Sequence, residues 1–270
     1  MKILYNNDNL SMALKSVSNL GFVPTMGSLH DGHLSLIKRS IRECGETIVS
    51  IFINPLQFNN KIDYIKYPKN FKKDLTILKK LNINYVFIPS KNDIYKFKRK
   101  SKIRINKKDK ILCAKFRKGH FEGVIDVMDR LTNLIKPKKI YMGEKDFRQL
   151  YLVNNYIEKR YKSKIIACKT IRDKNNLALS SRNLLLNDRQ KVNAGKLAQD
   201  LISLKNNLIK KDNIKKLFIN KKVYLSNLYN VTIEYLELRN RVNLKKTNIP
   251  KNSKLFIAYY LNKIRLIDNF

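Results

Sequence analysis

The sequence predicts an α/β fold, a parallel sheet with helices on both faces, followed by a smaller α+β domain. Over the first two thirds of the chain, β-branched apolar segments alternate with segments whose apolar residues recur at helical spacing. This alternation is typical of right-handed βαβ units. Segment 47–53 (TIVSIFI) is apolar throughout, which indicates a strand covered on both faces. After Thr170 the pattern changes, which indicates a second domain.

Each element of the first part has a local reason. The first strand, 21–25, leads into a glycine-containing turn, and the strand at 85–88 ends before Pro89, which has no N–H for a ladder. Helix 31–44 places Leu34, Ile37 and Ile41 on one face and stops at Gly45. Helix 146–161 begins at Asp146, a residue that can cap it. The other elements expected here are the strands 47–53, 139–142 and 164–169 and the helices 70–81 and 123–135.

The second part begins with a loop through residue 183. A helix follows from Asp188, capped by Asn187, with another over 214–225. Segments 231–238 and 255–260 are strand-like. We therefore expect two domains, 1–175 and 176–270, with the change falling within 170–185.

The charge of the chain allows two interpretations. It carries 57 Lys and Arg against 21 Asp and Glu, a formal net charge of +36. Such an excess is compatible with a nucleic-acid partner. However, the lysines are spread along the whole chain, and neither basic cluster, 96–110 or 205–222, has the aromatic or Cys/His pattern of a nucleic-acid module. We favour a general surface property, with some nonspecific nucleic-acid binding at low salt.

Cellular location is indicated by three features. The N-terminus, MKILYNNDNL, lacks the apolar stretch of a signal peptide, and no apolar run reaches the roughly 20 residues of a membrane span. Cys44, Cys113 and Cys168 are far apart and form no C-x-x-C motif, which favours reduced thiols. We expect a cytoplasmic protein.

The segment PTMGSLHDGH joins the first strand to the first helix. Its glycines allow a tight turn, and His30 and His33 lie where helix N–H groups favour an anion such as phosphate. A zinc site would need further ligands, and no cysteine lies nearby in the sequence. The alternative is a capping or core role, but two of only three histidines are here. We interpret the segment as a nucleotidyl-transfer site.

Two amides follow the next strand in SIFINPLQF. Asn54 and Gln57 can bind a hydroxyl or carboxylate without adding charge. Turn formation at Asn54–Pro55 explains Asn54 equally well, but it does not explain Gln57.

Three further motifs place polar groups after strands or in loops. FRKGHFEGV contains Arg117 beside a glycine, which can pair with a carboxylate or phosphate. YMGEKDFRQL opens a helix after a strand, with Lys145 available for phosphates and Asp146 for ribose hydroxyls or for capping. In LALSSRN, two hydroxyls and Arg182 can neutralise a polyphosphate from a loop able to close over the site.

Together these motifs resemble the pantothenate synthetase family over essentially the whole chain, including KYPKNFKKDL and the C-terminal RLIDN. The resemblance implies a Rossmann-like, doubly wound nucleotidyltransferase domain, a small C-terminal lid domain and a homodimer. It implies that pantoate attacks ATP, with Mg²⁺, to give pantoyl adenylate, and that β-alanine then displaces AMP. No specific nucleic-acid or membrane partner is implied.

The resemblance also assigns residue roles by motif position. The family pattern gives catalytic roles to His30, His33, Lys145 and Arg182, and an active-site position to Arg117. It implies that pantoate is held by Pro24, Met26, Gln57 and Gln149. It implies that ATP is bound by Met26, His30, His33, Gly143, Lys145, Asp146, Ile171, Leu179, Ser180, Ser181 and Arg182. No protein metal ligand is implied, because Mg²⁺ arrives on the ATP phosphates.

The sequence departs from the family pattern at Glu122, at Asp126 and Asp129, and at Asn175–Asn176, which replaces Asp-Gly before LALSSRN. The last change could stiffen or reshape that loop. The alternatives to a pantoate ligase are another H-x-G-H adenylyltransferase, which would not require pantoate, and a basic nucleic-acid-binding protein.

Overall fold

The computed structural model describes residues 1–59, 61–97, 103–106, 109–208 and 214–270. Parts of both basic clusters, 98–102, 107–108 and 209–213, lie outside the described residues. By its internal packing the chain divides into two units, Met1–Lys169 and Thr170–Phe270. None of the helices in the described ranges combines the length and apolar character needed to cross a membrane.

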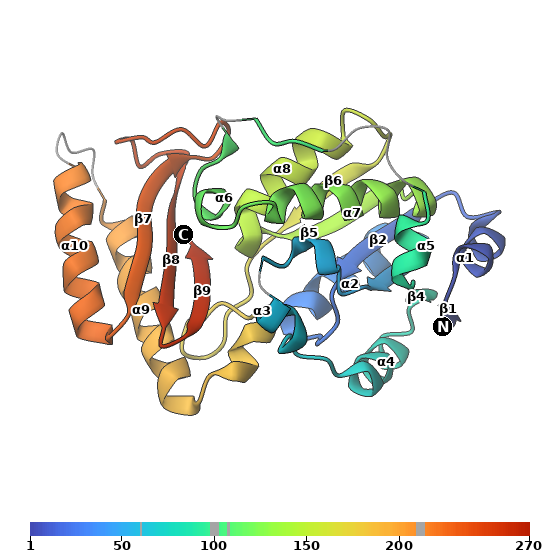
Figure 1. Cartoon of the computed structure of the whole chain (residues 1–270), viewed down its shortest axis with the longest axis horizontal. Coiled ribbons are helices and arrows are strands. Elements are labelled where there is room, and N and C mark those ends of the chain that lie inside the picture. The colour runs from blue at the N-terminus through green and yellow to red at the C-terminus, as the bar shows by residue number, and fades with distance from the viewer. Residues whose placement is uncertain (60, 98–102, 107–108, 209–213) are drawn as a thin grey trace. The chain divides into compact units, whose positions relative to one another are not determined.

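The first unit is built on a six-stranded sheet with the order β1-β4-β3-β2-β5-β6, in which every pair is parallel (Figure 1). From β2 the chain adds β3 and then β4 on one side of the sheet, and it then adds β5 and β6 on the other side of β2. The strand order therefore reverses between β2 and β5. Ligands of such sheets bind outside the carboxyl ends of the strands at this reversal. The strands are β1 (Lys2–Leu4), β2 (Leu20–Thr25), β3 (Glu46–Ile51), β4 (Tyr85–Phe87), β5 (Lys139–Gly143) and β6 (Lys164–Cys168).

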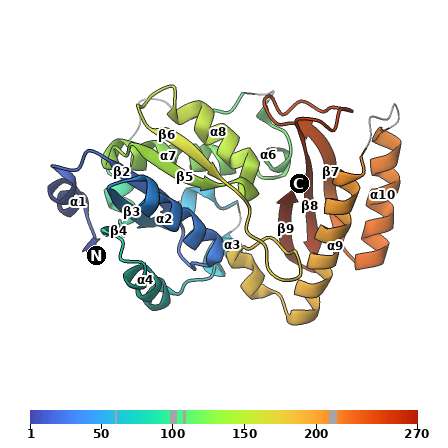
Figure 2. The same cartoon turned by 180° about the vertical axis from the view of Figure 1, so that it is seen from behind.

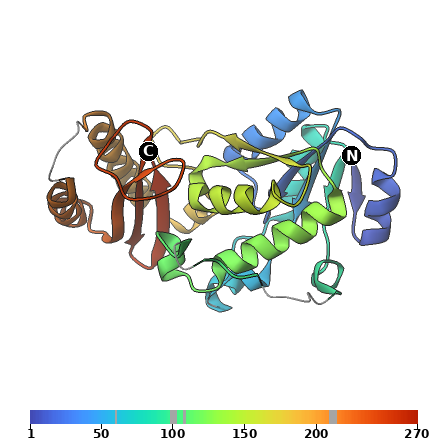
Figure 3. The same ribbon diagram turned by 90° about the horizontal axis from the view of Figure 1, so that it is seen from above.

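Helices cover both faces of this sheet, because adjacent strand residues point to opposite sides. Phe22 packs with α1, α7 and α8, whereas its neighbour Val23 packs with α2 and α4. Figure 3 shows α7 and α2 on opposite sides of the strands, and Figure 2 shows α2 in front of them. The predicted doubly wound α/β fold is confirmed. The helices are α1 (Asn7–Leu14), α2 (Asp31–Glu43), α3 (Lys61–Ile65), α4 (Phe71–Lys80), α5 (Lys91–Tyr95), α6 (Cys113–Phe116), α7 (His120–Ile135) and α8 (Phe147–Ile157), with short 3₁₀ turns η1 (Pro55–Gln57) and η3 (Glu144–Asp146).

The sequence-based boundaries differ from these in a few places. Helix α7 begins three residues earlier than predicted, at His120, and α8 ends at Ile157 instead of 161. The prediction that Asp146 caps α8 with its side chain is wrong, because it occupies the N-cap position without making a capping hydrogen bond. The short elements β1, α1, α3, α5 and α6 were not predicted, since three to eight residues carry too little periodicity.

The second unit is an antiparallel sheet of β7 (Thr232–Asn240), β8 (Ser253–Leu261) and β9 (Ile264–Asn269), with α9 (Asp188–Asn206) and α10 (Ile214–Tyr229). One apolar cluster joins both helices to the sheet. The predicted cap is confirmed, since Asn187 accepts a hydrogen bond from the backbone N–H of Gln190 at 2.9 Å. The predicted α+β character is also confirmed, with β9 as an additional strand.

Candidate active site

The two histidines lie at the start of α2, after the loop that follows β2 at the reversal point of the first sheet. His30 is the N-cap of α2, and its Nδ1 accepts the backbone N–H of Gly32 at 3.1 Å. The Nδ1 of His33 accepts the backbone N–H of His30 at 3.4 Å. The two rings pack against each other with their centroids 4.0 Å apart and their planes tilted by 37°. The capping role that the sequence left open for these histidines is therefore present.

These contacts fix the tautomer of both rings. A neutral imidazole carries one proton, and an Nδ1 that accepts a hydrogen bond places that proton on Nε2. Burial, followed by the charge of Lys145, lowers the pKa of His30 to about 4. Burial, followed by the neighbouring His30, lowers the pKa of His33 to about 3. At neutral pH both rings are thus uncharged Nε2–H donors, suited to an anionic oxygen.

These lowered pKa values predict a pH dependence of stability. Between the usual histidine pKa of 6.5 and about 4, the unfolded chain binds protons that the folded chain does not. The free energy of unfolding should therefore fall as the pH is lowered through this window. Urea unfolding at pH 7, 6, 5 and 4.5, repeated on His33→Asn, measures the effect, and the variant should show a shallower decline. Equal slopes for both proteins would contradict the prediction.

The residues after β5 lie close to this pair. Lys145 and Asp146 both act on the pKa values of His30 and His33, Lys145 lowering and Asp146 raising them. They belong to η3 directly after β5, the neighbour of β2 in the sheet. The structure thus brings together, at one sheet edge, two motifs more than 100 residues apart in the sequence. Gly143 ends β5, and the position that a Cβ on it would occupy is open space.

Gln57 occupies the same edge, after β3, and only 8% of it is exposed. Its side-chain amide donates to the sulfur of Met26. Asn54, in contrast, has a structural role: it caps η1 through Leu56 N–H at 3.1 Å and donates to the carbonyl of Gly123 at 3.1 Å. The turn-forming alternative for Asn54 is confirmed.

His120 holds Gln57 in place from α7. Its Nδ1 lies 2.5 Å from the Gln57 carbonyl oxygen, which can only accept, so this nitrogen carries the proton. Nε2 is then the acceptor for Arg117 Nη1 at 2.8 Å. The third histidine therefore has the opposite tautomer from the first two. Arg117, predicted as an active-site residue, is thereby linked to Gln57 through one ring. The remaining predicted residues of this unit are Pro24 in β2 and Gln149 in α8, both half-buried.

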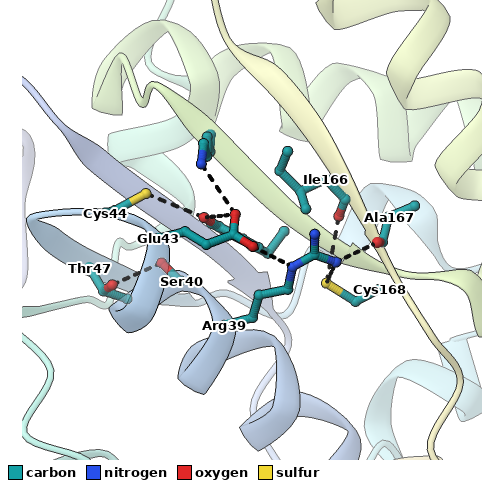
Figure 4. A network of polar contacts seen from close by, with 10 residues as sticks. Arg39, Ser40, Glu43, Cys44, Thr47, Ile166, Ala167 and Cys168 are labelled. Atoms are coloured by element: carbon teal, nitrogen blue, oxygen red, sulfur yellow. Dashed lines mark hydrogen bonds and ion pairs between the residues drawn. The ribbon is translucent and has the colours of Figure 1, made fainter.

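Helix α2 is anchored at its far end by a polar network (Figure 4). Arg39 donates to Glu43 at 2.7 Å and to the carbonyl of Ala167, in β6, at 2.9 Å. Glu43 also accepts from Lys139 and Tyr141 of β5. These contacts hold the C-terminal end of α2 against β5 and β6. They thereby fix the position of the helix whose first turn carries His30 and His33. The network leaves no signal in the sequence, because the residues that Arg39 and Glu43 contact in β5 and β6 are over 90 residues away.

The other predicted nucleotide-binding residues belong to the second unit. Ile171 and Leu179 pair across a tight loop, with Leu179 N–H donating to the Ile171 carbonyl at 2.9 Å. Ser180 caps the 3₁₀ turn η4 (Ser181–Leu185) by accepting the N–H of Arg182 at 3.3 Å, so its hydroxyl proton points elsewhere. Ser181 is buried and Arg182 half-buried.

The Asn175–Asn176 departure is accommodated within this loop. Asn176 has φ +69°, in the left-handed region, where asparagine is the best substitute for glycine. Asp173 accepts the N–H groups of Asn175 and Leu177 at 2.8 and 2.9 Å. Arg172 holds the Asn176 carbonyl at 2.9 Å and forms a two-point ion pair with Asp268 of the RLIDN motif at 2.7 and 2.9 Å. The loop thus retains a glycine-type turn.

The acidic departures in α7 also have partners. Asp126 pairs with Arg130 at 3.1 Å, and Asp129 accepts the hydroxyl of Tyr161 at 2.9 Å. Both are therefore structural within the helix and its packing. Nothing in the structure explains Glu122.

Comparison with known proteins gives a consistent result. The model of the family described as Pantoate-beta-alanine ligase matches residues 2–270. A pantothenate synthetase of Endomicrobium trichonymphae is 38% identical over 277 residues, covering all of this chain and 97% of that protein. One of Campylobacter hominis is 39% identical over 273 residues, covering 100% and 99%.

Solved structures agree with the sequence comparison. The pantothenate synthetase of Thermus thermophilus superposes with a TM-score of 0.92 at 29% identity, over 100% of this chain and 99% of that one. The Francisella tularensis pantoate-beta-alanine ligase, described as complexed with beta-gamma ATP and beta-alanine, superposes with a TM-score of 0.85 at 35% identity, over 100% and 97%.

Proposed function

Because the chain belongs to the pantoate–β-alanine ligase family, we propose that it joins pantoate to β-alanine in two steps through a pantoyl adenylate. The pantoate carboxylate attacks the α-phosphorus of ATP and pyrophosphate leaves. The amine of β-alanine then attacks the acyl carbon, AMP leaves with the electron pair of the broken C–O bond, and the amine loses a proton. A carboxylate is already a nucleophile, so positioning and electrostatics supply most of the rate of the first step.

The observation that supports this most directly is the pair of neutral Nε2–H donors at the reversal of the sheet. In this proposal His30 and His33 donate to the ATP phosphates and stabilise the negative charge that grows on the leaving pyrophosphate. Both rings donate in their neutral form, without a change of protonation state, and burial strengthens their hydrogen bonds. Lys145 adds the positive charge that the two rings lack.

The other roles follow the family pattern. Gln57 and Gln149 would hold pantoate by neutral hydrogen bonds, in a pocket shaped by Pro24 and Met26. The second unit would act as a lid that protects the adenylate from water. The groups proposed for ATP are Gly143 and Asp146 for the ribose, Ser180, Ser181 and Arg182 for the phosphates, and Ile171 and Leu179 as further ATP contacts. Arg117 is proposed as a further active-site residue.

Magnesium enters this proposal as part of the substrate MgATP. Within the described ranges, no three His, Cys, Asp or Glu side chains are grouped so that they could hold a metal ion. In this proposal the ATP phosphates supply the ligands, as hard oxygens that Mg²⁺ prefers.

The test is exchange of labelled pyrophosphate into ATP, with Mg²⁺ and without β-alanine. We expect exchange only when pantoate is present, and formation of pantothenate and AMP once β-alanine is added. Exchange supported by another acid and not by pantoate would indicate a different adenylyltransferase. Folded protein that shows no exchange with any acid would contradict the two-step proposal.

We also propose a cytoplasmic homodimer. None of the three cysteines forms a disulfide in the structure, which suits a reducing compartment. The dimer follows the family pattern alone, and light scattering on the purified protein would test it, with a monomer mass of 31.8 kDa as the contrary result.

A further inference from the structure

The loop that leads to the histidines is bound by a carboxylate from another helix, α4. Asp74, in the first turn of α4, is only 2% exposed. Its Oδ2 accepts the backbone N–H of Ser28 at 2.7 Å, and its Oδ1 accepts that of Leu29 at 2.8 Å. Both oxygens of one buried carboxylate are thus used on two successive backbone groups.

The backbone that it binds is unusual. Gly27 and Ser28 both have positive φ, +76° and +53°. Successive N–H groups in a turn of this kind converge and form a nest for an anion. Glycine adopts this conformation freely, but for serine it is unfavourable. Something must therefore hold Ser28 there, and the two hydrogen bonds to Asp74 do so.

This turn determines where the site begins. It follows Met26 directly, and Leu29 directly precedes His30, the N-cap of α2. We propose that Asp74 is a positioning residue for adenylation: by filling the nest with a carboxylate of the protein, it sets the path from β2 into α2 and so the placement of His30 and His33. The inference rests on the phosphate-binding role proposed for those histidines.

A direct role for the carboxylate is the competing explanation. Asp74, Met26 and Gly27 also line a cavity of about 340 Å³ at the carboxyl ends of β2 and β3, so Asp74 could contact a bound ligand. The two explanations differ in whether a second substitution can compensate for the loss of the Asp74 carboxylate. A substitution in the loop that relieves backbone strain can restore the loop conformation, but it cannot restore a contact between Asp74 and a ligand.

The first variant is Asp74→Asn, which keeps the shape but replaces one acceptor oxygen by an amide that cannot accept. We expect kcat for exchange to fall about 10- to 50-fold, with the KM for ATP and pantoate within about threefold, because small misplacements act mainly on the transition state. The matched control is Asp93→Asn, since Asp93 also accepts a backbone N–H, that of Ser90 at 2.9 Å, at the start of α5. Its kcat should not change. An unchanged kcat for Asp74→Asn would overturn the proposal.

The second variant adds Ser28→Gly to Asp74→Asn. Glycine adopts the left-handed conformation freely, so kcat of the double variant should be at least about threefold higher than kcat of Asp74→Asn. Ser28→Gly alone is the control, and it shows what the glycine does when Asp74 is present. No recovery would overturn the positioning role in favour of direct contact.

A third variant covers the case in which Asp74→Asn does not fold. A Cβ on Gly27 would lie 3.0 Å from Asp74 Oδ2 and 3.2 Å from Ile51 Cγ2, and Gly27 has φ +76°. Gly27→Ala therefore strains the turn and crowds the carboxylate, and it should lower kcat similarly. Retained activity there would contradict the proposal. Full exchange activity after replacement of His30 would contradict the proposed phosphate-binding site. Full activity of the Asp74 variants, together with a loss of activity in the His30 variant, would contradict the positioning role of Asp74 alone.

Discussion

Replacing His30 by Asn should lower pantoate-dependent exchange of pyrophosphate into ATP by about 10²- to 10³-fold, the usual loss for one donor to developing charge. Asparagine is among the best N-cap residues, so it can still accept an N–H at the start of α2. What it lacks is the Nε2–H of the imidazole. The substitution therefore separates the donor role of His30 from its capping role.

Two measurements complete this experiment. Thermal unfolding of His30→Asn should remain close to that of the unaltered protein, which would exclude loss of the fold as the cause. Asn6→Ala is the control for capping, because Asn6 caps α1 by accepting the N–H of Asn9 at 2.8 Å. It should cost about 1 kcal/mol of stability and leave kcat unchanged. Full activity of His30→Asn would show that the Nε2–H is not needed.

Replacing Gly123 by Ala should damage both the fold and pantoate binding. A Cβ on Gly123, in α7, would lie 2.4 Å from the Leu56 carbonyl oxygen, 2.8 Å from its carbonyl carbon and 3.1 Å from the Gln57 nitrogen. These are backbone atoms of η1, so no side chain can rotate away. We expect the free energy of unfolding to fall by about 2–3 kcal/mol, as is typical of overpacking, and the KM for pantoate to rise severalfold because Gln57 moves.

Gly45→Ala is the matched control for this substitution. Its Cβ would have no neighbour nearer than 3.9 Å, and its backbone is not left-handed. Chemical denaturation should show little change, within about 0.5 kcal/mol, and the KM for pantoate should stay the same. If Gly123→Ala were as stable as Gly45→Ala and bound pantoate normally, helix α7 would not constrain Gln57 as the structure indicates.

The sequence predicted the fold class well because the strands of the first unit are long apolar segments separated by helices of regular period. It did less well with short elements such as β1 and α6, whose few residues are ordered by their neighbours instead of by their own pattern. Capping showed the same limit. Asn187 caps α9 as predicted, whereas Asp146 lies at the start of α8 without a capping hydrogen bond. Residue type indicates that a cap is possible, and the local backbone decides whether it forms.

The residues of the candidate site were identified from the sequence because each motif is local: a strand, a turn and polar groups in sequence order. The sequence by itself therefore determined the family and the α/β class, and it predicted a set of site residues around His30, Gln57 and Lys145. Only the tertiary structure decided how these side chains are held. The tautomers of the histidines depend on which backbone group each Nδ1 meets, and the turn before His30 depends on Asp74, 45 and 46 residues away from the groups it binds. Such long-range hydrogen bonds leave no periodic signal in a chain, because they arise only when separate elements pack together.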